Sequence, residues 1–336
     1  MRKTSMLKNR LLVPALVGLC LIPTLVAAAA SFSEDFSSNP LLHGWGVSGD
    51  TNLFAWNPIG TNLQVTWDSA QTNSYFYHPL GTVLGKEDDF ALEFELRLSD
   101  ISTNTATGPF EIAIGFINFA EATSANFWRG SGIDPAHGPR DLAEFDYFPA
   151  GYYDGYGPVY PSISPTLVDS DNNFASGFAL LELTTNDLFH VWLTYSASNQ
   201  TLHTDITRNG APYGPVDDVT LPPSFTDMRL DTVAVCSYSA VGDPYDSVLA
   251  HGTVDYIVVT LPPPPVVGMT GGFANGAWQA QFTSRTNWVY SLERTVDFQS
   301  WTAVAGPLNG DGTNLTLVDP MPPADHAFYR VRALLP

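Results

Sequence analysis

Large apolar residues recur at every second position along most of this chain. Between residues 90 and 98 the alternate residues are Phe90, Leu92, Phe94, Leu96 and Leu98. Successive side chains of a β-strand point to opposite faces, so this spacing puts all five on one face of a sheet. The runs at 63–67, 110–116, 191–195 and 254–258 repeat the spacing. The pattern predicts an all-β protein whose sheets bury their apolar faces as a sandwich or a barrel.

Residues 1–30 have the three parts of a secretory signal peptide. Four basic residues precede an apolar run at 11–26, and alanines at 27–30 are the small residues that a signal peptidase requires. A membrane anchor is the alternative, but the apolar run is short for a helix that crosses a bilayer. No second run of that length follows. We therefore expect a bacterial protein without a transmembrane span that is secreted or held at the cell surface.

The charge of the chain excludes one class of partner. The sequence holds 14 basic residues (Lys and Arg) and 34 acidic ones. Four of the basic residues and none of the acidic ones fall in the signal peptide, which leaves a formal charge of −24. Such a surface repels nucleic acids and anionic membranes. The mature chain keeps a single cysteine, Cys236, which lies in an apolar run, so we expect it to be buried without a disulfide partner.

Four consecutive prolines at 262–265 predict the boundary between two domains. Prolines cannot lie in a central strand, and they favour a stiff extended linker. Residues 31–261 then form the larger β-domain, and residues 266–336 a small β module of about five strands. This module resembles the short β modules that end many secreted proteins of environmental bacteria, for which surface attachment and simple capping are both open roles.

The segment at 119–174 is rich in Gly, Pro, Tyr and Asp and contains one strand-like run, at 142–148. Long irregular stretches inside a compact domain are usually functional or disordered, and the aromatic residues of this one argue against disorder. Glu144 and Asp146 are two residues apart in this run, so both carboxylates point to the same face of a strand. With Asp154 and a nearby backbone carbonyl, they offer the hard oxygen ligands that Ca²⁺ prefers. A solvated acidic strand face is the alternative.

The run at 144–149, followed by Asp154, resembles the metal-binding strand and loop of legume lectins. These lectins belong to the concanavalin A-like jelly-roll group, so the resemblance implies an antiparallel β-sandwich over residues 31–261. It also implies a set of four metal ligands: Glu144, Asp146, Phe148 and Asp154. Ala150 and Ser162 stand where the lectins have a calcium-binding asparagine and a metal-binding histidine. The resemblance therefore leaves Ca²⁺ as the only cofactor that we predict.

The same fold group contains laminarinase-like glycoside hydrolases, so a hydrolase is an alternative. Their active strand carries Glu-x-Asp-x-Glu, and a retaining mechanism needs two carboxyl groups about 5 Å apart. Here the third position is Phe148, whose ring cannot transfer a proton. The sequence also lacks a His-Glu-x-x-His zinc motif and a Gly-x-Ser-x-Gly nucleophile elbow. We therefore expect no catalytic residues.

Aromatic residues in the same segment indicate a carbohydrate site. Sugar rings stack on aromatic planes, while carboxylates and amides bind their hydroxyl groups. The predicted carbohydrate-binding residues are Trp128, Tyr152, Tyr153, Asp154 and Tyr156. Packing of the rings onto the sheet is the alternative. The sequence thus predicts a secreted, non-catalytic, lectin-like protein that binds an extracellular glycan or polysaccharide, and a structural or adhesive protein without a sugar site is the main alternative.

Overall fold

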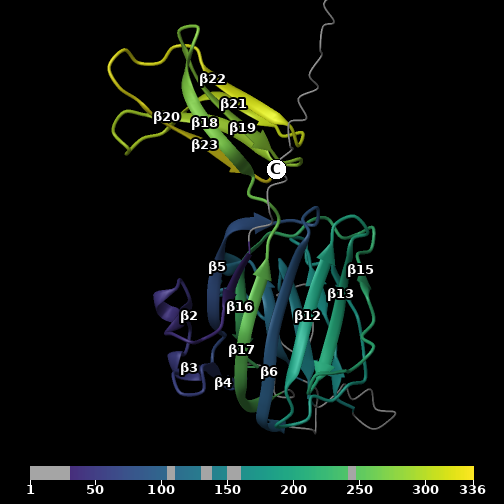
Figure 1. The fold of residues 1–336 in the computed structure, drawn as a ribbon. Helices are drawn as coiled ribbons and strands as arrows, with labels where there is room; N and C mark the ends of the chain where they lie inside the picture. The colour runs from purple at the N-terminus through teal and green to yellow at the C-terminus, as the bar shows by residue number, and fades with distance from the viewer. Residues whose placement is uncertain (1–30, 104–109, 130–137, 150–159, 241–246) are drawn as a thin grey trace, which may run out of the picture.

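The computed structural model describes residues 31–103, 110–129, 138–149, 160–240 and 247–336. In these ranges the chain forms two large antiparallel sheets that pack face to face, with two small sheets beyond one end of them (Figure 1). The prediction of an all-β sandwich is confirmed. The helical parts are η1 (Pro40–Leu42), η2 (Thr51–Leu53) and α1 (Phe119–Ala122). No helix of the described ranges is long and apolar enough to cross a membrane.

The first large sheet has nine strands in the order β14-β13-β12-β6-β17-β4-β3, with β1 beside β17 and β15 beside β13. Its strands are β1 (Ser31–Glu34), β3 (Phe54–Asn57), β4 (Asn62–Asp68), β6 (Phe90–Thr103), β12 (Phe189–Ser196), β13 (Thr201–Arg208), β14 (Ala211–Pro212), β15 (Val219–Thr220) and β17 (Val248–Thr260). The long strands β6 and β17 pair along most of their length and form the middle of this sheet.

The second large sheet has eight strands in the order β11-β10-β8-β7-β16-β5-β2, with β9 beside β8. Its strands are β2 (Gly46–Ser48), β5 (Ser74–Leu84), β7 (Ile112–Ile117), β8 (Leu142–Phe148), β9 (Ser162–Ile163), β10 (Thr166–Val168), β11 (Phe174–Ser176) and β16 (Leu230–Ser237). The strand that carries the predicted metal ligands, β8, is therefore an inner strand of this sheet.

One hydrophobic core fills the space between the two large sheets. The alternate residues of β6 from 90 to 98 are all buried, as predicted. The ring of Phe94 meets that of Phe145 on β8 edge-on at 5.6 Å, and the ring of Phe90 meets that of Phe116 on β7 at 5.2 Å. The period-two face of β6 therefore packs against the inward face of the opposite sheet.

The alternation predicted for 254–258 is wrong in its second half. Val254 is buried, but Tyr256 is 43% exposed, and Ile257 and Val259 are buried instead. The pairing of β17 with β6 shifts register inside this run, and Tyr256 has a φ of +48°. Such a β-bulge inserts an extra residue and exchanges the faces of the residues that follow it.

The C-terminal module consists of two three-stranded antiparallel sheets, β18-β19-β22 and β21-β20-β23. Its strands are β18 (Val266–Ala274), β19 (Ala277–Ser284), β20 (Val289–Thr295), β21 (Thr302–Asn309), β22 (Asn314–Asp319) and β23 (Phe328–Leu334). A second hydrophobic cluster, separate from the first, lies in this module around the fully buried Tyr290 and Leu292. The structure has six strands where the sequence predicts about five. The additional strand is β18, which is mostly exposed and therefore has no period-two pattern in its sequence.

Polar contacts join the module to the sandwich. The guanidinium of Arg285 forms an ion pair with Asp88, in the turn before β6, and its Nη1 donates to the carbonyl of Pro263 in the linker at 3.0 Å. Arg229 on the sandwich donates from Nη2 to the carbonyl of Pro336 at 2.6 Å. These contacts tie the last residue and the linker to the same end of the sandwich.

Candidate functional site

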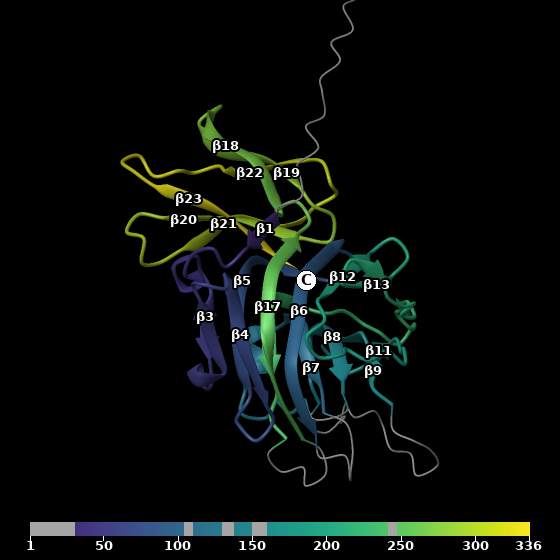
Figure 2. The same cartoon turned by 60° about the horizontal axis from the view of Figure 1, so that its bottom comes forward.

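The strand with the predicted metal ligands is covered on both faces. β8 is paired with β7 on one side and with β10 and β9 on the other (Figure 2). Its side chains from Leu142 to Tyr147 are all buried. Phe145 points into the core, so Glu144 and Asp146 point to the opposite face of the sheet. Both are fully buried there, which excludes the alternative of a solvated acidic strand face.

A buried arginine faces these two carboxylates. Arg129, which follows α1, is 2% exposed. Its Nη2 lies 2.8 Å from Asp146 Oδ2, and its Nε lies 3.3 Å from Glu144 Oε2. On a third side its Nη1 lies 3.8 Å from Oε1 of Glu111, the residue before β7. We call these four residues (Arg129, Glu111, Glu144 and Asp146) the arginine cluster.

Burial raises the pKa of all three carboxyl groups in the arginine cluster. It raises the pKa of Glu111 to about 8, against the opposing effect of Arg129, and the pKa of Glu144 to about 7, where Asp146 adds to the rise. Burial also raises the pKa of Asp146, although Arg129 favours its charged form. One guanidinium cannot neutralise three carboxylates, so protons supply the remaining balance.

Aromatic residues connect the arginine cluster with the molecular surface. The hydroxyl of Tyr238, which follows β16, donates a hydrogen bond to Glu144 Oε1. The ring of Tyr238 lies 5.9 Å from that of Phe127 and 6.0 Å from that of Tyr75. The Tyr75 hydroxyl in turn donates to the backbone carbonyl of Ala122 at 2.8 Å. The cluster and its aromatic neighbours thus hold both α1 and the residues that follow it.

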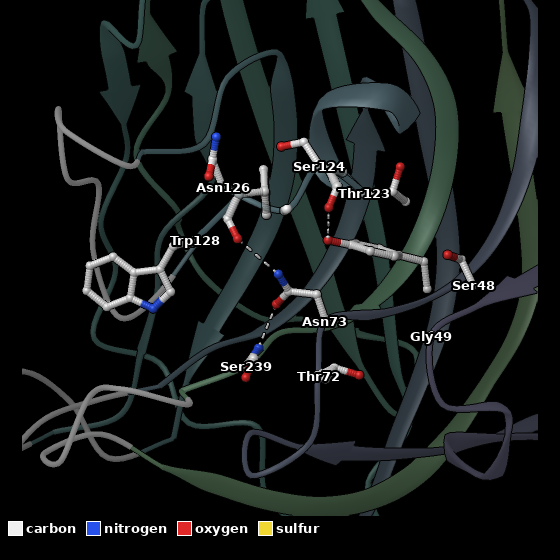
Figure 3. Close-up of a pocket in the computed structure, with 13 residues that line it drawn as sticks. Ser48, Gly49, Thr72, Asn73, Thr123, Ser124, Asn126, Trp128 and Ser239 are labelled. Carbon is white, nitrogen blue, oxygen red and sulfur yellow. Dashed lines mark hydrogen bonds between the residues drawn. The ribbon is translucent and has the colours of Figure 1, made fainter.

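An open pocket of about 660 Å³ lies beside this segment (Figure 3). Polar and aromatic residues from separate parts of the chain line it, among them Ser48, Thr72, Asn73, Ser124, Asn126 and Trp128. The side chain of Asn73 connects two of these parts, because its Nδ2 donates to the carbonyl of Phe127 at 3.2 Å and its Oδ1 accepts from the backbone N–H of Ser239 at 2.8 Å. Trp128 is partly exposed and Asn126 is exposed. The pocket therefore offers an aromatic plane together with amide and hydroxyl groups.

The predicted site residues fall in different places. Trp128 lines the pocket. The other predicted carbohydrate-binding residues lie outside the described residues: Tyr152, Tyr153, Asp154 and Tyr156. Phe148, predicted to give calcium its backbone carbonyl, ends β8, where it pairs with Ser162 on β9. Glu144 and Asp146 lie together, as predicted, but they share Arg129.

The described residues do not fit a divalent ion between Glu144 and Asp146. Across the part of the chain that the structure describes, no three His, Cys, Asp or Glu side chains are arranged to hold a metal. Ca²⁺ needs six to eight oxygen ligands, and the guanidinium of Arg129 already occupies the space that these two carboxylates face. Calcium binding that involves Asp154 stays a prediction.

Sequence reasoning missed three residues that surround the two carboxylates, Glu111, Arg129 and Tyr238. It also missed Asn73 in the wall of the pocket. A signal for Arg129 was present. Glu144 and Asp146 stand in a run of otherwise apolar residues, which indicates burial, and buried carboxylates require a partner. Arg129 is one of only ten Lys and Arg residues beyond position 30, and it lies in the same segment. The distance of 15 and 17 residues along the chain concealed the pairing.

Comparison with protein-family models finds no match to this sequence. Comparison with curated proteins finds no relative either. Solved structures that resemble the chain include peanut lectin, at 16% identity and a TM-score of 0.43, covering 70% of this chain and 99% of that one. Lectin I of Ulex europaeus has 12% identity and a TM-score of 0.45, with 70% and 99% covered. Winged bean acidic lectin has 10% identity and a TM-score of 0.43, with 69% and 99% covered. These structures are legume lectins.

Proposed function

We propose that this protein binds a carbohydrate without catalysing a reaction, and that the pocket beside Trp128 is the binding site. The single observation that carries the proposal is the make-up of this pocket, where a partly exposed indole stands with amide and hydroxyl side chains (Figure 3). Sugar rings require this combination, because their C–H faces stack on aromatic planes while their hydroxyl groups need hydrogen-bond partners.

The residues of the pocket divide into two roles. Both polar atoms of the Asn73 side chain already bond to backbone groups, so Asn73 holds the wall in place. Ser124 and Asn126 are exposed on the same segment as Trp128 and can bond to the sugar. Tyr152, Tyr153, Asp154 and Tyr156 belong to the proposal as further contributors, on the basis of the sequence.

Two observations support a function without catalysis. Glu144, at the first of the two outer positions where a laminarinase-like enzyme carries its reacting carboxylates, is fully buried and paired with Arg129. The third position that such an enzyme needs is Phe148. A retaining hydrolase places two carboxyl groups on either side of the scissile bond, which requires that the substrate reach both. We therefore propose a secreted carbohydrate-binding protein, with secretion inferred from residues 1–30.

A glycan array probed with the mature protein tests the proposal, followed by calorimetric titration of the best glycan. We expect Trp128→Ala to weaken binding at least tenfold, which corresponds to about 1.4 kcal/mol. Trp192→Ala is the matched control, because Trp192 is also partly exposed but lies on β12 of the other sheet. The control should bind as the wild type does.

Three results would contradict the proposal. The first is an array on which no glycan is bound, and the second is a Trp128→Ala variant that binds with unchanged affinity. The third is release of reducing sugar from laminarin or lichenan that disappears in Glu144→Gln, because this would make the protein a hydrolase.

An adhesive role of the C-terminal module is a second candidate. Several large apolar side chains are exposed on this module: Met269, Phe273, Phe298 and Met321, at 53%, 71%, 59% and 80%. We propose on this basis that the module contacts another surface. Loss of residues 266–336 should then release the protein from the cell surface into the medium, and unchanged retention would exclude this role.

A further inference from the structure

We infer that the guanidinium of Arg129 takes the place of the divalent cation that the legume-lectin resemblance implies, so that the region around the pocket is held together without a metal ion. The inference about the cation rests on the geometry of the arginine cluster and on the resemblance of the run at 144–149, and it does not depend on sugar binding. Its consequence for ligand binding rests on the proposed function.

The guanidinium of Arg129 lies where the resemblance places metal ions. Glu144 and Asp146 are the two same-face carboxylates of β8 that the resemblance assigns to metal ions. Arg129 contacts each of them with a different nitrogen atom: its Nε lies 3.3 Å from Glu144 Oε2, and its Nη2 lies 2.8 Å from Asp146 Oδ2. It also lies 3.8 Å from Glu111, so it bridges groups from two separate stretches of the chain, β8 and the residue before β7. A metal ion in a lectin-like site would have the same bridging task.

The positive charge of Arg129 opposes the binding of a divalent ion at the same carboxylates. The arginine cluster is buried, so charges inside it are poorly screened. A divalent ion at the same carboxylates would lie next to a fixed positive charge that cannot be deprotonated. The ion and the guanidinium therefore exclude each other. Because the guanidinium belongs to the protein itself, it is always present, and the ion is the one that is excluded.

The arginine cluster is connected to the pocket through the two residues before Arg129. Trp128 precedes Arg129 directly, and the carbonyl of Phe127 accepts the hydrogen bond from Asn73. Tyr238 bonds to Glu144 and contacts the ring of Phe127. Anchoring of the Arg129 side chain thus sets the position of the two residues before it. Arg129 is a positioning residue for the proposed site.

Removal of the guanidinium would leave buried carboxyl groups without a cation. Both Oε atoms of Glu111 and Oδ1 of Asp146 are buried without a hydrogen-bond partner among the described residues. Without Arg129, three carboxyl groups would face a space of the size of a guanidinium. Carboxylate oxygens around such a space are what Ca²⁺ and Mn²⁺ bind. The Arg129→Ala variant should therefore gain the ion dependence that the wild type lacks.

The test is a thermal melt of the mature protein in excess EDTA, in CaCl₂ and in MnCl₂. We expect the wild type to melt at the same temperature in all three. Arg129→Ala should melt at least about 5 °C lower in EDTA, because its buried carboxyl groups lose their partner. CaCl₂ or MnCl₂ should restore part of this loss, and calorimetric titration should find one ion per chain. The control is Arg140→Ala, which removes an exposed arginine close in sequence and should melt as the wild type does in all three solutions.

Two outcomes of the melts would overturn the inference. One is a loss of stability in EDTA, restored by Ca²⁺, that the wild type shares with Asp154→Asn, because an ion would then be held without Asp154, at the carboxylates that Arg129 faces. The other is an Arg129→Ala variant that melts as the wild type does. If Arg129→Ala does not fold, Arg129→Lys replaces it, since it keeps a positive charge. The lysine variant should fold and be insensitive to EDTA, and EDTA sensitivity in it would equally overturn the inference.

Glycan titration separates this inference from the proposed function. Arg129→Lys should weaken the binding of the best array glycan at least threefold, because a single ammonium cannot hold two carboxylates as the guanidinium fork does. Unchanged affinity in Arg129→Lys would remove the positioning role. If the wild type binds no glycan, the proposed function fails, while the melts still decide whether Arg129 stands in place of the ion.

Discussion

Gly115 on β7 lies directly opposite Glu144 on β8, and the two backbones approach so closely that a Cβ at Gly115 would come within 2.6 Å of the Glu144 Cα atom. The absence of a side chain at Gly115 therefore lets β7 pack against β8 at the residue that binds Arg129. Real Cβ atoms essentially never approach a neighbour so closely.

Gly115→Ala should destabilise the sandwich, because the added methyl group meets backbone that cannot move independently. We expect a loss of about 1–3 kcal/mol in the free energy of unfolding, measured by urea denaturation. Gly272→Ala on β18 is the control, since a Cβ there meets no atom within 4 Å. Equal midpoints for both variants would show that the approach of β7 to β8 is not tight.

Cys236 should be inert in the folded protein. It is fully buried on β16, and burial raises the pKa of its thiol well above the usual range. The reactive form of a thiol is the thiolate, which is both scarce and inaccessible here. A thiol reagent should therefore label the mature protein orders of magnitude more slowly in buffer than in urea. Rapid stoichiometric labelling in buffer would contradict the burial.

Asp255 should make the stability depend on pH. Burial raises its pKa to about 6, Glu95 across the strands adds to the rise, and Arg97 opposes it. The folded protein thus holds this proton more tightly than the unfolded chain does. The stability contributed by Asp255 is complete below about pH 3.8 and is lost as the pH rises to about 6.

The variant Asp255→Asn should remove this part of the pH dependence. The slope of the urea midpoint against pH, measured between about pH 3.8 and about 6, should be more positive in the variant than in the wild type. Asp325→Asn is the control, because Asp325 is 93% exposed, and it should keep the wild-type slope. A variant slope equal to that of the wild type would show that Asp255 titrates in the same way in both states.

Tyr290→Ala should unfold the C-terminal module and leave the sandwich intact. Tyr290 is fully buried in the second hydrophobic cluster, and its hydroxyl donates to the carbonyl of Pro265 at 2.6 Å. Loss of a buried aromatic ring destabilises a core by about 3–5 kcal/mol. Scanning calorimetry should show one transition that moves to lower temperature and one that does not. Phe273→Ala, at an exposed site, should move neither, and a single shared transition in Tyr290→Ala would contradict the prediction of two domains.

The strands with regular alternation could be predicted from the sequence, because a strand repeats every two residues and one face of each sheet is buried. This held for β6, whose five alternate apolar residues all line the core. It failed at β17, where the bulge near Tyr256 exchanges the two faces. It also failed for β9, β10 and β11, which have two or three residues each and are too short to show a period.

The amino-acid order by itself determined that Glu144 and Asp146 share one face of a strand, since this follows from a spacing of two residues. Only the tertiary structure decided what that face meets. The sheet buries β8 on both sides, and the segment after α1 brings Arg129 from 15 and 17 positions away onto the two carboxylates. No local pattern encodes such a contact. It forms because carboxylates that lose water on burial need a partner, and chain folding brings the cation to them.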